Sequence, residues 1–499
     1  MKVFAINNIN VNFYGNKVLP VHNALPVKSA PTNLSLPDAL NGKTKFYVDN
    51  VNKLRNETKE FPNDVEYRKT LLKNAGMNPN EYYKIRSIIG PDEIQSVMKQ
   101  YDNDGNLYSV GVNDENIKSG LLRANLHIHT QASDGRLSVE ELLDKAADYA
   151  NLAAKKQPQF KKQPFTIAIT DHDTTESAQK AIKIIAENPL KYKNLRVILG
   201  TEVTTYNKIA PNLVSEPTNT HVLAYGIDPN EKIYKNFIEG TKNRKNELEK
   251  RMINDANELG KNIFVLNEAK EFSNFLDKKL IGICNHMASY LKTKYVLSEI
   301  VCKNDEIKSL LKQKNMPTEP KTLIKELDEY LQERYNRNKP INPKTELVDF
   351  IKDDRFGEIL TKEYENPQHK EFLQKIDEIN QSYYTKMDGS EKFHAMPKFE
   401  DLYNGLKGQK NAIIGLAHPL KPTWNLNSAD DKLTFLKDFY SKFKSAFKEK
   451  AKFSEVYYQS YKQTAEQPVQ TFLNQISKAL KLFRTGSADS HGKNIFKRF

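Results

Sequence analysis

Cysteine is scarce in this chain, which limits how the protein can be stabilised. Its 499 residues include two cysteines, Cys284 and Cys302. Two cysteines cannot build a disulfide framework, and reduced thiols are typical of proteins in a reducing compartment. The sequence therefore predicts a cytoplasmic protein.

Long apolar runs are also missing. No segment offers the roughly 20 consecutive apolar residues that span a bilayer. Residues 1–20 contain Asn, Gly and Lys among their apolar residues, and so lack the continuous apolar stretch of a secretory signal. We expect neither a membrane-spanning segment nor a secretory leader, and no membrane partner.

The charge balance is basic. The chain has 76 Lys and Arg against 63 Asp and Glu, a formal net charge of +13. Basic proteins attract polyanions. The excess is modest, because charged residues make up 28% of the chain, near the average for soluble proteins. The positive net charge agrees with a phosphate-bearing substrate. Nothing in the sequence points to a protein partner.

Histidines gather beside short apolar runs, where a buried strand would deliver a side chain to the rim of an active site. Seven of the ten histidines have such neighbours: His127, His129, His172, His221, His286, His418 and His491. The other three, His22, His369 and His394, lie in polar, helical or loop-like sequence and are predicted to be surface residues.

Carboxylates accompany these histidines. They are Asp134, Asp171, Asp173, Glu202 and Asp489. A lone histidine at a strand end is usually a hydrogen-bonded residue, but a set of this size favours a metal centre. Imidazole together with carboxylate suits Zn, Mn or Fe better than Ca or Mg.

Strands and helices alternate after the first histidine pair. A helix is expected from the capping box at 138–141, a strand at 165–170, a helix at 175–187 and a strand at 195–199. Alternation of this kind implies an α/β protein with a mainly parallel sheet covered on both faces, as in a barrel.

Other segments read differently. Residues 1–60, rich in Asn, Pro, Ser and Lys, are predicted to be a disordered tail, and 61–120 a small extension with helices near 64–72 and 92–100 and a turn at 102–105. Residues 292–400 are charged and helical, with an apolar stripe at Leu323, Ile324, Leu327 and Leu331. They form a helical insertion, either a substrate-selecting lid or a subdomain without a functional role.

Six motifs, in order, resemble those of the PHP (polymerase and histidinol phosphatase) phosphoesterases. They are Leu126-His-Ile-His-Thr-Gln-Ala-Ser-Asp-Gly-Arg-Leu137, Ile167-Ala-Ile-Thr-Asp-His-Asp-Thr174, Gly200-Thr-Glu-Val-Thr204, the segment 221–228, Ala417-His-Pro419 and Gly486-Ser-Ala-Asp-Ser-His491. The chain looks most like the branch of nucleoside 3′,5′-bisphosphate phosphatases and 5′→3′ exoribonucleases. The resemblance covers about 121–492 and implies a distorted (β/α)7 PHP-type barrel, with 121–291 and 401–499 as its two parts.

The resemblance also implies two to three divalent ions, Mn, Zn or Fe, in one pocket. The first would be held by His127, His129, Glu202 and Asp489, the second by Glu202, His221 and His418, and the third by Asp134, His172 and His491. Such ions lower the pKa of a shared water and neutralise phosphoryl oxygens. A metal-bound hydroxide would attack, and no protein nucleophile is required.

Further roles are expected around these ligands. Asp171 and Asp173 flank His172 and would orient ligating imidazoles, with a helix N-cap as the alternative for Asp173. His286 and Arg244 match family positions near substrate phosphate, Arg244 having a solvated helix charge as its alternative. The family usually has arginine where Cys284 stands, which weakens the second phosphate clamp.

The sequence thus predicts a metal-dependent phosphoesterase acting on nucleotides or nucleic-acid ends, as a 5′→3′ exonuclease or a nucleoside bisphosphate phosphatase. Three alternatives stay open: a histidinol-phosphate-type phosphatase, an amidohydrolase-like C–N hydrolase and a metal-free PHP binding module. Glu202, in place of a lysine available for carboxylation, argues against the second. The intact set of nine ligands argues against the third.

Overall fold

The computed structural model describes most of the chain after residue 60. The described ranges are 61–103, 123–156, 164–215, 217–272, 283–334, 342–386, 396–458, 467–487 and 489–492. The predicted tail, 1–60, lies outside them. Of the predicted turn at 102–105 the first two residues are described, and they end helix α3 (Pro91–Asn103).

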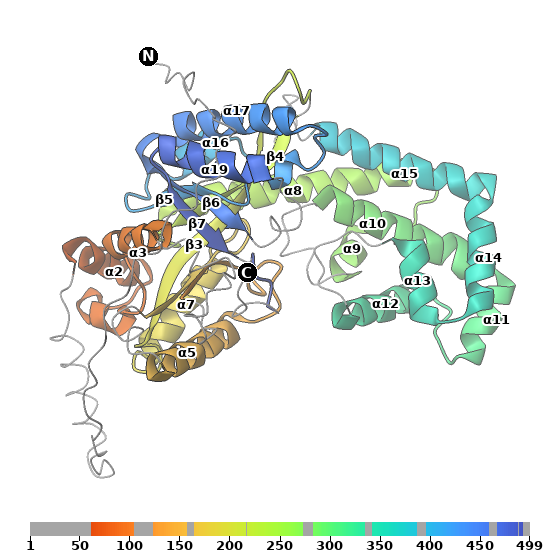
Figure 1. Cartoon of the computed structure of the whole chain (residues 1–499). Coiled ribbons are helices and arrows are strands. Elements are labelled where there is room, and N and C mark those ends of the chain that lie inside the picture. Colours follow the sequence, from red (N-terminus) through yellow and green to blue (C-terminus); the bar gives the residue numbers. More distant parts are fainter. Residues whose placement is uncertain are drawn as a thin grey trace, which may run out of the picture. The chain divides into compact units, whose positions relative to one another are not determined.

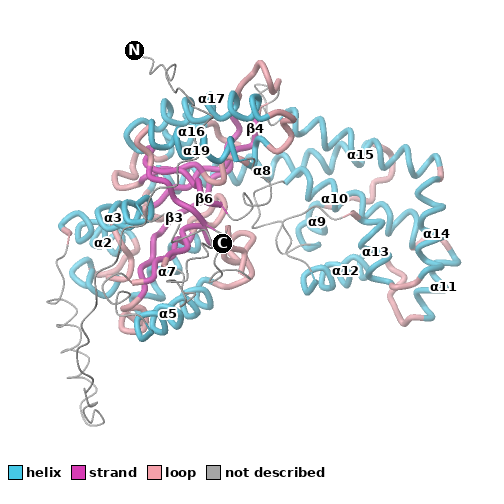
Figure 2. Tube along the Cα trace, viewed as in Figure 1, coloured by secondary structure: helices cyan, strands magenta, loops and turns pink. Residues whose placement is uncertain are grey.

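Seven strands form one sheet, in chain order from β1 to β7. They are β1 (Ala124–Ile128), β2 (Phe165–Ile169), β3 (Leu195–Asn207), β4 (Thr218–Tyr225), β5 (Ile413–Leu416), β6 (Ala451–Tyr458) and β7 (Phe483–Ser487). Figure 2 shows these strands gathered in one body, with helices around them. The α/β class is therefore confirmed.

Neighbouring strands pair in parallel except at β4, which runs antiparallel to both β3 and β5. The prediction of a mainly parallel sheet is confirmed apart from this strand. The connection 208–217 is shorter than the dozen or so residues of a parallel crossover, so the chain turns back along β3. This pairing also extends β3 to Asn207, well beyond the strand predicted at 195–199.

The first and last strands approach each other just beyond their ends. The Ser490 amide donates to the His127 carbonyl, and the His129 amide donates to the Ser490 carbonyl, both at 2.9 Å. The sheet is thus curled, and the curl brings the first strand beside the segment that follows the last strand.

Helices cover the sheet, and two of them, α5 (Val139–Lys156) and α7 (Glu176–Glu187), begin where the sequence predicted. Helix α5 follows the expected capping box, in which the Ser138 amide donates to Glu141 Oε2 at 2.8 Å and the Glu141 amide donates to Ser138 Oγ at 3.1 Å. Helix α7 packs beside α5. Helices α17 (Ala429–Phe447) and α19 (Gln467–Ala479) pack against each other and on β6, as Figure 1 shows.

The N-terminal extension is part of the packed body. It comprises α2 (Pro62–Asn74), the short helix η1 (Pro79–Ile85) and α3, which confirms the two predicted helices. Ile94, Met98 and Tyr101 of α3 pack in one apolar cluster with Tyr225 and Phe453 of the sheet. The Tyr101 hydroxyl donates to the Gly486 carbonyl at 2.8 Å, which ties α3 to β7.

Residues between β4 and β5 form helices and, in the part that the structure describes, no strand (Figure 2). These are α8 (Lys232–Glu258), α9 (Leu266–Phe272), α10 (Ile283–Tyr295), the π-helix η3 (Val296–Val301), α11 (Asp305–Gln313), α12 (Pro320–Arg334), α13 (Pro343–Ile351), α14 (Asp354–Glu365), α15 (Pro367–Lys386) and α16 (Phe399–Gly405). All of them except α16, whose Phe399 and Leu402 pack in the core of the sheet, contribute to a second apolar core, which includes the whole stripe predicted on α12. None of the described helices combines the length and apolar character needed to cross a membrane.

Candidate metal centre

The ends of the strands bring all nine sequence-predicted ligands together. His127 lies on β1, Glu202 on β3 and His221 on β4. The others follow strand ends: His129 and Asp134 after β1, His172 after β2, His418 after β5, and Asp489 and His491 after β7. Their side chains are buried or nearly so, with exposed fractions from 0% to 14%.

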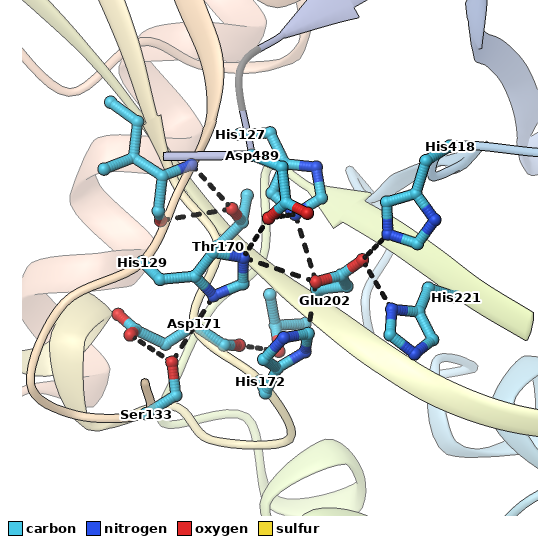
Figure 3. A network of polar contacts seen from close by, with 12 residues as sticks. His127, His129, Ser133, Thr170, Asp171, His172, Glu202, His221, His418 and Asp489 are labelled. Atoms are coloured by element: carbon cyan, nitrogen blue, oxygen red, sulfur yellow. Dashed lines mark hydrogen bonds and ion pairs between the residues drawn. The ribbon is translucent and has the colours of Figure 1, made fainter. Parts of the chain in front are cut away.

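Glu202 is the centre of this cluster. Its Oε2 lies 3.0 Å from His127 Nε2, 3.0 Å from His172 Nδ1 and 3.4 Å from His129 Nε2. Its Oε1 lies 3.0 Å from both His221 Nδ1 and His418 Nε2. Figure 3 shows the carboxylate between these two groups of imidazoles, so that each oxygen faces a different group.

Two aspartates complete the cluster. Asp489 Oδ1 lies 3.1 Å from His129 Nε2 and 3.5 Å from His127 Nε2. Asp134 Oδ2 lies 3.0 Å from His491 Nε2, and Asp134 Oδ1 lies 3.3 Å from His129 Nδ1. Asp489 faces imidazoles of the first strand and its end, whereas Asp134 faces His129 of its own loop and His491 from the end of the last strand.

Three overlapping groups have ligand atoms within 4.8 Å of one another: His127, His129, Glu202 and Asp489; His172, Glu202 and His221; and His129, Asp134, His172 and His491. Each group could hold a metal ion. The first equals the first expected ligand set, whereas His129 and His172 are shared more widely than the resemblance implied. This sharing arises because both rings lie between Glu202 and Asp134.

Asp171 shapes the loop that carries Asp134. It was expected to orient a ligating imidazole, but its carboxylate accepts instead from residues of this loop. Its Oδ1 accepts from the Thr130 amide at 2.7 Å and from Ser133 Oγ at 2.6 Å, and its Oδ2 accepts from Thr130 Oγ1 at 2.8 Å. The loop is tight, since a Cβ on Gly135 would lie 2.1 Å from the His129 carbonyl oxygen. Asp171 therefore contacts His129 only indirectly, through Ser133, whose Oγ lies 3.4 Å from His129 Nδ1.

Asp173 departs from both of its expected roles. Its backbone is left-handed (φ 49°), unlike the extended backbone typical of an N-cap, and α7 begins only at Glu176. Its carboxylate accepts from Lys245 Nζ at 2.9 Å and from the Thr204 amide at 3.2 Å. Both side chains of the Asp173–Lys245 pair are fully buried. The loop carrying His172 is thus tied to α8.

Glu455, on β6, is a functional candidate that the sequence did not reveal. Its two carboxylate oxygens each lie 3.2 Å from His127 Nδ1, and Oε2 accepts from the His418 amide at 2.9 Å. The signal available in the sequence was a carboxylate within the strand-like run Phe453-Ser-Glu-Val-Tyr-Tyr458.

Lys421 is a second such candidate. It follows β5 in the short helix η4 (Lys421–Thr423), where its Nζ donates to Asp489 Oδ2 at 2.8 Å. Its side chain is 31% exposed, against 9% for Asp489. Lys421 lies where solvent reaches the cluster. The signal available in the sequence was a basic residue three positions after His418.

Arg244, one of the expected phosphate-binding residues, does not lie in the cluster. Arg244 is exposed on α8, donates to Thr241 Oγ1 at 3.0 Å and lines a cavity of about 590 Å³ with Pro397 and Asp401. The side chains of His286 and Cys284 lie outside the described residues.

The histidines predicted to lie on the surface give a mixed result. His369 is half-buried in α15, where its Nδ1 lies 2.8 Å from the Tyr295 hydroxyl. The surface prediction was therefore wrong in part, because the helix packs this residue against α10. His22 and His394 lie outside the described residues.

Charge within the cluster fits bound cations. Burial raises the pKa of Glu202, but His127, His172 and His221 outweigh it and hold this pKa well below its usual value. Burial lowers the pKa of His129, yet Asp134, Asp489 and Glu202 raise it to about 10. The carboxylates therefore stay ionised and draw positive charge, which divalent ions would supply in place of imidazole protons.

The geometry around His172 also fits a bound cation. Its buried Nδ1 lies 3.0 Å from Glu202 Oε2 but makes no properly directed hydrogen bond. A nitrogen and a carboxylate oxygen placed close together without hydrogen-bond geometry suit a shared cation. Burial lowers the pKa of His172 well below its usual value, so the ring is neutral, as a ligand must be.

Comparisons with known proteins give little further guidance. No family model and no curated protein matches this chain. Among solved structures, it is similar to a putative metal-dependent phosphoesterase from Bifidobacterium adolescentis, with 17% identity, a TM-score of 0.35 and coverage of 74% of this chain and 88% of the other. It is also similar to an amidohydrolase from Chromobacterium violaceum with bound sulfate and no metal, with 16% identity, a TM-score of 0.36 and the same coverage. Scores this low do not establish a common fold, so the arrangement of side chains carries the functional argument.

Proposed function

We propose that this protein is a metal-dependent hydrolase of phosphate esters, with a distorted (β/α)7 barrel of the PHP type and with nucleotides or nucleic-acid ends as substrates. The observation that carries the proposal is the position of Glu202. One carboxylate oxygen faces His127 and His172, and the other faces His221 and His418, each at 3.0 Å. A carboxylate shared in this way is suited to bridge two metal ions.

Divalent ions at such a site would activate a water molecule and neutralise phosphoryl oxygens, which is the chemistry that phosphate ester hydrolysis needs. The chain's own residues prepare this site. Because the Glu455 carboxylate can only accept, His127 Nδ1 carries its proton, and the Nε2 lone pair is left for a ligand. His491 is fixed in the same way, since its Nδ1 donates to the Asp489 carbonyl at 2.8 Å.

Ser133 is not suited to act as a protein nucleophile in this arrangement. Ser133 Oγ lies 3.4 Å from His129 Nδ1, which resembles the start of a catalytic triad. However, Ser133 is fully buried and donates its proton to Asp171 at 2.6 Å. It can neither reach a substrate nor pass its proton to the imidazole.

Lys421 supports a phosphate ester as the substrate. Burial lowers the pKa of its amine, but Asp489 and the other carboxylates raise it above its usual value, so the ammonium is charged. The Lys421 side chain is partly exposed, and its ammonium, beside a candidate metal-binding carboxylate, is placed to bind a phosphoryl oxygen. C–N hydrolysis has no comparable observation in its favour.

The test is a comparison of initial rates on three substrates. Metal-loaded protein is incubated with 5′-phosphorylated oligoribonucleotides, a nucleoside 3′,5′-bisphosphate and histidinol phosphate. We expect turnover of one of the first two, loss of this activity in Glu202→Gln, and normal activity in Glu247→Gln, an exposed carboxylate on α8. Hydrolysis of histidinol phosphate alone, or of no ester, would refute the proposal.

A further inference from the structure

An exposed tryptophan lies three residues after Lys421, whose amine binds a carboxylate of the candidate metal centre. Trp424 is the single tryptophan of the chain, and 50% of its surface is exposed. It directly follows η4, the short helix that begins at Lys421. A large aromatic side chain exposed to this degree offers a flat apolar face to a ligand.

Backbone hydrogen bonds fix the segment that carries it. The Lys421 amide donates to the His418 carbonyl at 2.9 Å, the Trp424 amide to the Lys421 carbonyl at 3.3 Å and the Leu426 amide to the Thr423 carbonyl at 3.0 Å. Thr423 is buried, and its hydroxyl donates to the Leu420 carbonyl at 2.8 Å. The exposed indole therefore stands on an ordered turn.

The helix geometry relates Trp424 to Lys421. In a 3-10 helix, side chains three positions apart lie on the same side of the axis. Trp424 has helical backbone angles (φ −61°, ψ −28°), so this relation extends to it. The Lys421 side chain reaches Asp489 of the cluster at 2.8 Å. The geometry of the turn therefore places Trp424 on the side from which Lys421 extends.

We propose that Trp424 is a specificity-determining residue that stacks on the base of a nucleotide whose phosphate is bound beside Lys421. Residues three apart in a 3-10 helix are separated by roughly 6 Å along the axis, a distance that a ribose between phosphate and base can span. Stacking on an aromatic ring needs no particular base, so the site accepts nucleotides with any base. This inference rests on the proposed function and names the substrate class of the same site.

Fluorescence tests the contact without turnover. Because the chain has one tryptophan, its emission reports on position 424 alone. The probe is the phosphonate analogue of adenosine 5′-monophosphate, in which carbon replaces the ester oxygen, added to metal-loaded protein. We expect saturable quenching by this analogue and little change with the phosphonate analogue of ribose 5-phosphate, which has no base. Equal responses to the two analogues, or no response to either, would overturn the inference.

Kinetics provide the second test. Trp424→Ala should raise KM for the nucleotide about tenfold, which lies in the range of one stacked base, whereas the rise for ribose 5-phosphate should be several-fold smaller. Trp424→Phe should restore most of the affinity. Leu152→Ala, which removes a similarly exposed apolar side chain on α5, is the matched control.

The outcomes separate this inference from the proposed function. If the wild type hydrolyses nucleotides and Trp424→Ala leaves their KM unchanged, or raises the KM of both substrates equally, the stacking role is wrong and the phosphoesterase stands. If quenching occurs but no ester is hydrolysed, base binding stands and the proposed function is wrong.

Discussion

Glu455 illustrates how a residue outside any motif can control a ligand. It holds His127 through two contacts of 3.2 Å and also accepts from the His418 amide, so one carboxylate orients parts of two strand ends. Partners of this kind usually change metal affinity by about 10- to 100-fold when they are removed.

We predict that Glu455→Gln weakens metal binding by this factor of about 10 to 100, because an amide cannot hold the Nδ1 proton of His127 as a carboxylate does. Competition titration against a chelator of known affinity measures the change. Glu449→Gln, at an exposed position shortly before β6, is the control. Equal affinity in the two variants would show that Glu455 has no role in orienting His127.

At the residue scale, the sequence was sufficient to identify the nine clustered side chains. It was not sufficient to identify the residues that bind and orient them. The candidates stood out because the histidines lay beside short apolar runs and carboxylates accompanied them. Glu455, Lys421 and Lys245 have no such signal, since their roles depend on which strand ends and helices meet in the fold. Asp173 was misread for the same reason: its partner, Lys245, lies 72 residues away.

Helix α8 connects the two apolar cores. Tyr234 and Ile238 pack in the core of the sheet, whereas Leu248 and Met252 pack in the helical core. Lys245 lies between these two stretches and binds Asp173, next to His172. The buried ion pair thus fixes the helix against the loop that carries a candidate ligand.

We predict that Lys245→Met lowers the free energy of unfolding by about 3–5 kcal/mol, because it leaves the Asp173 carboxylate buried without its partner. Denaturant unfolding measures this loss. The double variant Asp173→Asn with Lys245→Met should recover most of it. Lys294→Met, which breaks the less buried pair with Glu268, should cost less. Similar losses in Lys245→Met and Lys294→Met would contradict a special role for the pair.

At the scale of elements, periodicity and capping signals placed the starts of the predicted helices and strands within a few residues. They could not give the direction of β4 or the length of β3. Both depend on the short connection 208–217 and on the pairing of the two strands, which are properties of the fold and not of either segment alone. The helices of 292–400 were predicted from the composition of this segment. The second apolar core of the molecule, however, also includes Leu248 and Met252 of α8.

For the molecule as a whole, the cluster joins residues from His127 to His491. The unfolded chain cannot bring these side chains together, so metal ions bind the folded state preferentially. Ligands that bind only the folded state stabilise it by an amount that grows with their concentration.

We predict that manganese at about 100 times its dissociation constant adds about 2.7 kcal/mol per site to the free energy of unfolding and raises Tm, and that a chelator reverses the shift. Differential scanning calorimetry with and without the metal measures the effect. Glu202→Gln should show a much smaller shift, because it removes the carboxylate common to two ligand groups. An equal Tm with metal and with chelator would contradict the prediction.

The most direct test of the account is the metal content of the purified protein. Elemental analysis of the wild type after growth with ample manganese should find close to three divalent ions per chain, and Glu202→Gln should retain one or none, since Glu202 faces both groups of imidazoles. His369→Ala, a half-buried histidine of α15, should keep the wild-type content. One ion or none in the wild type would contradict the trinuclear centre.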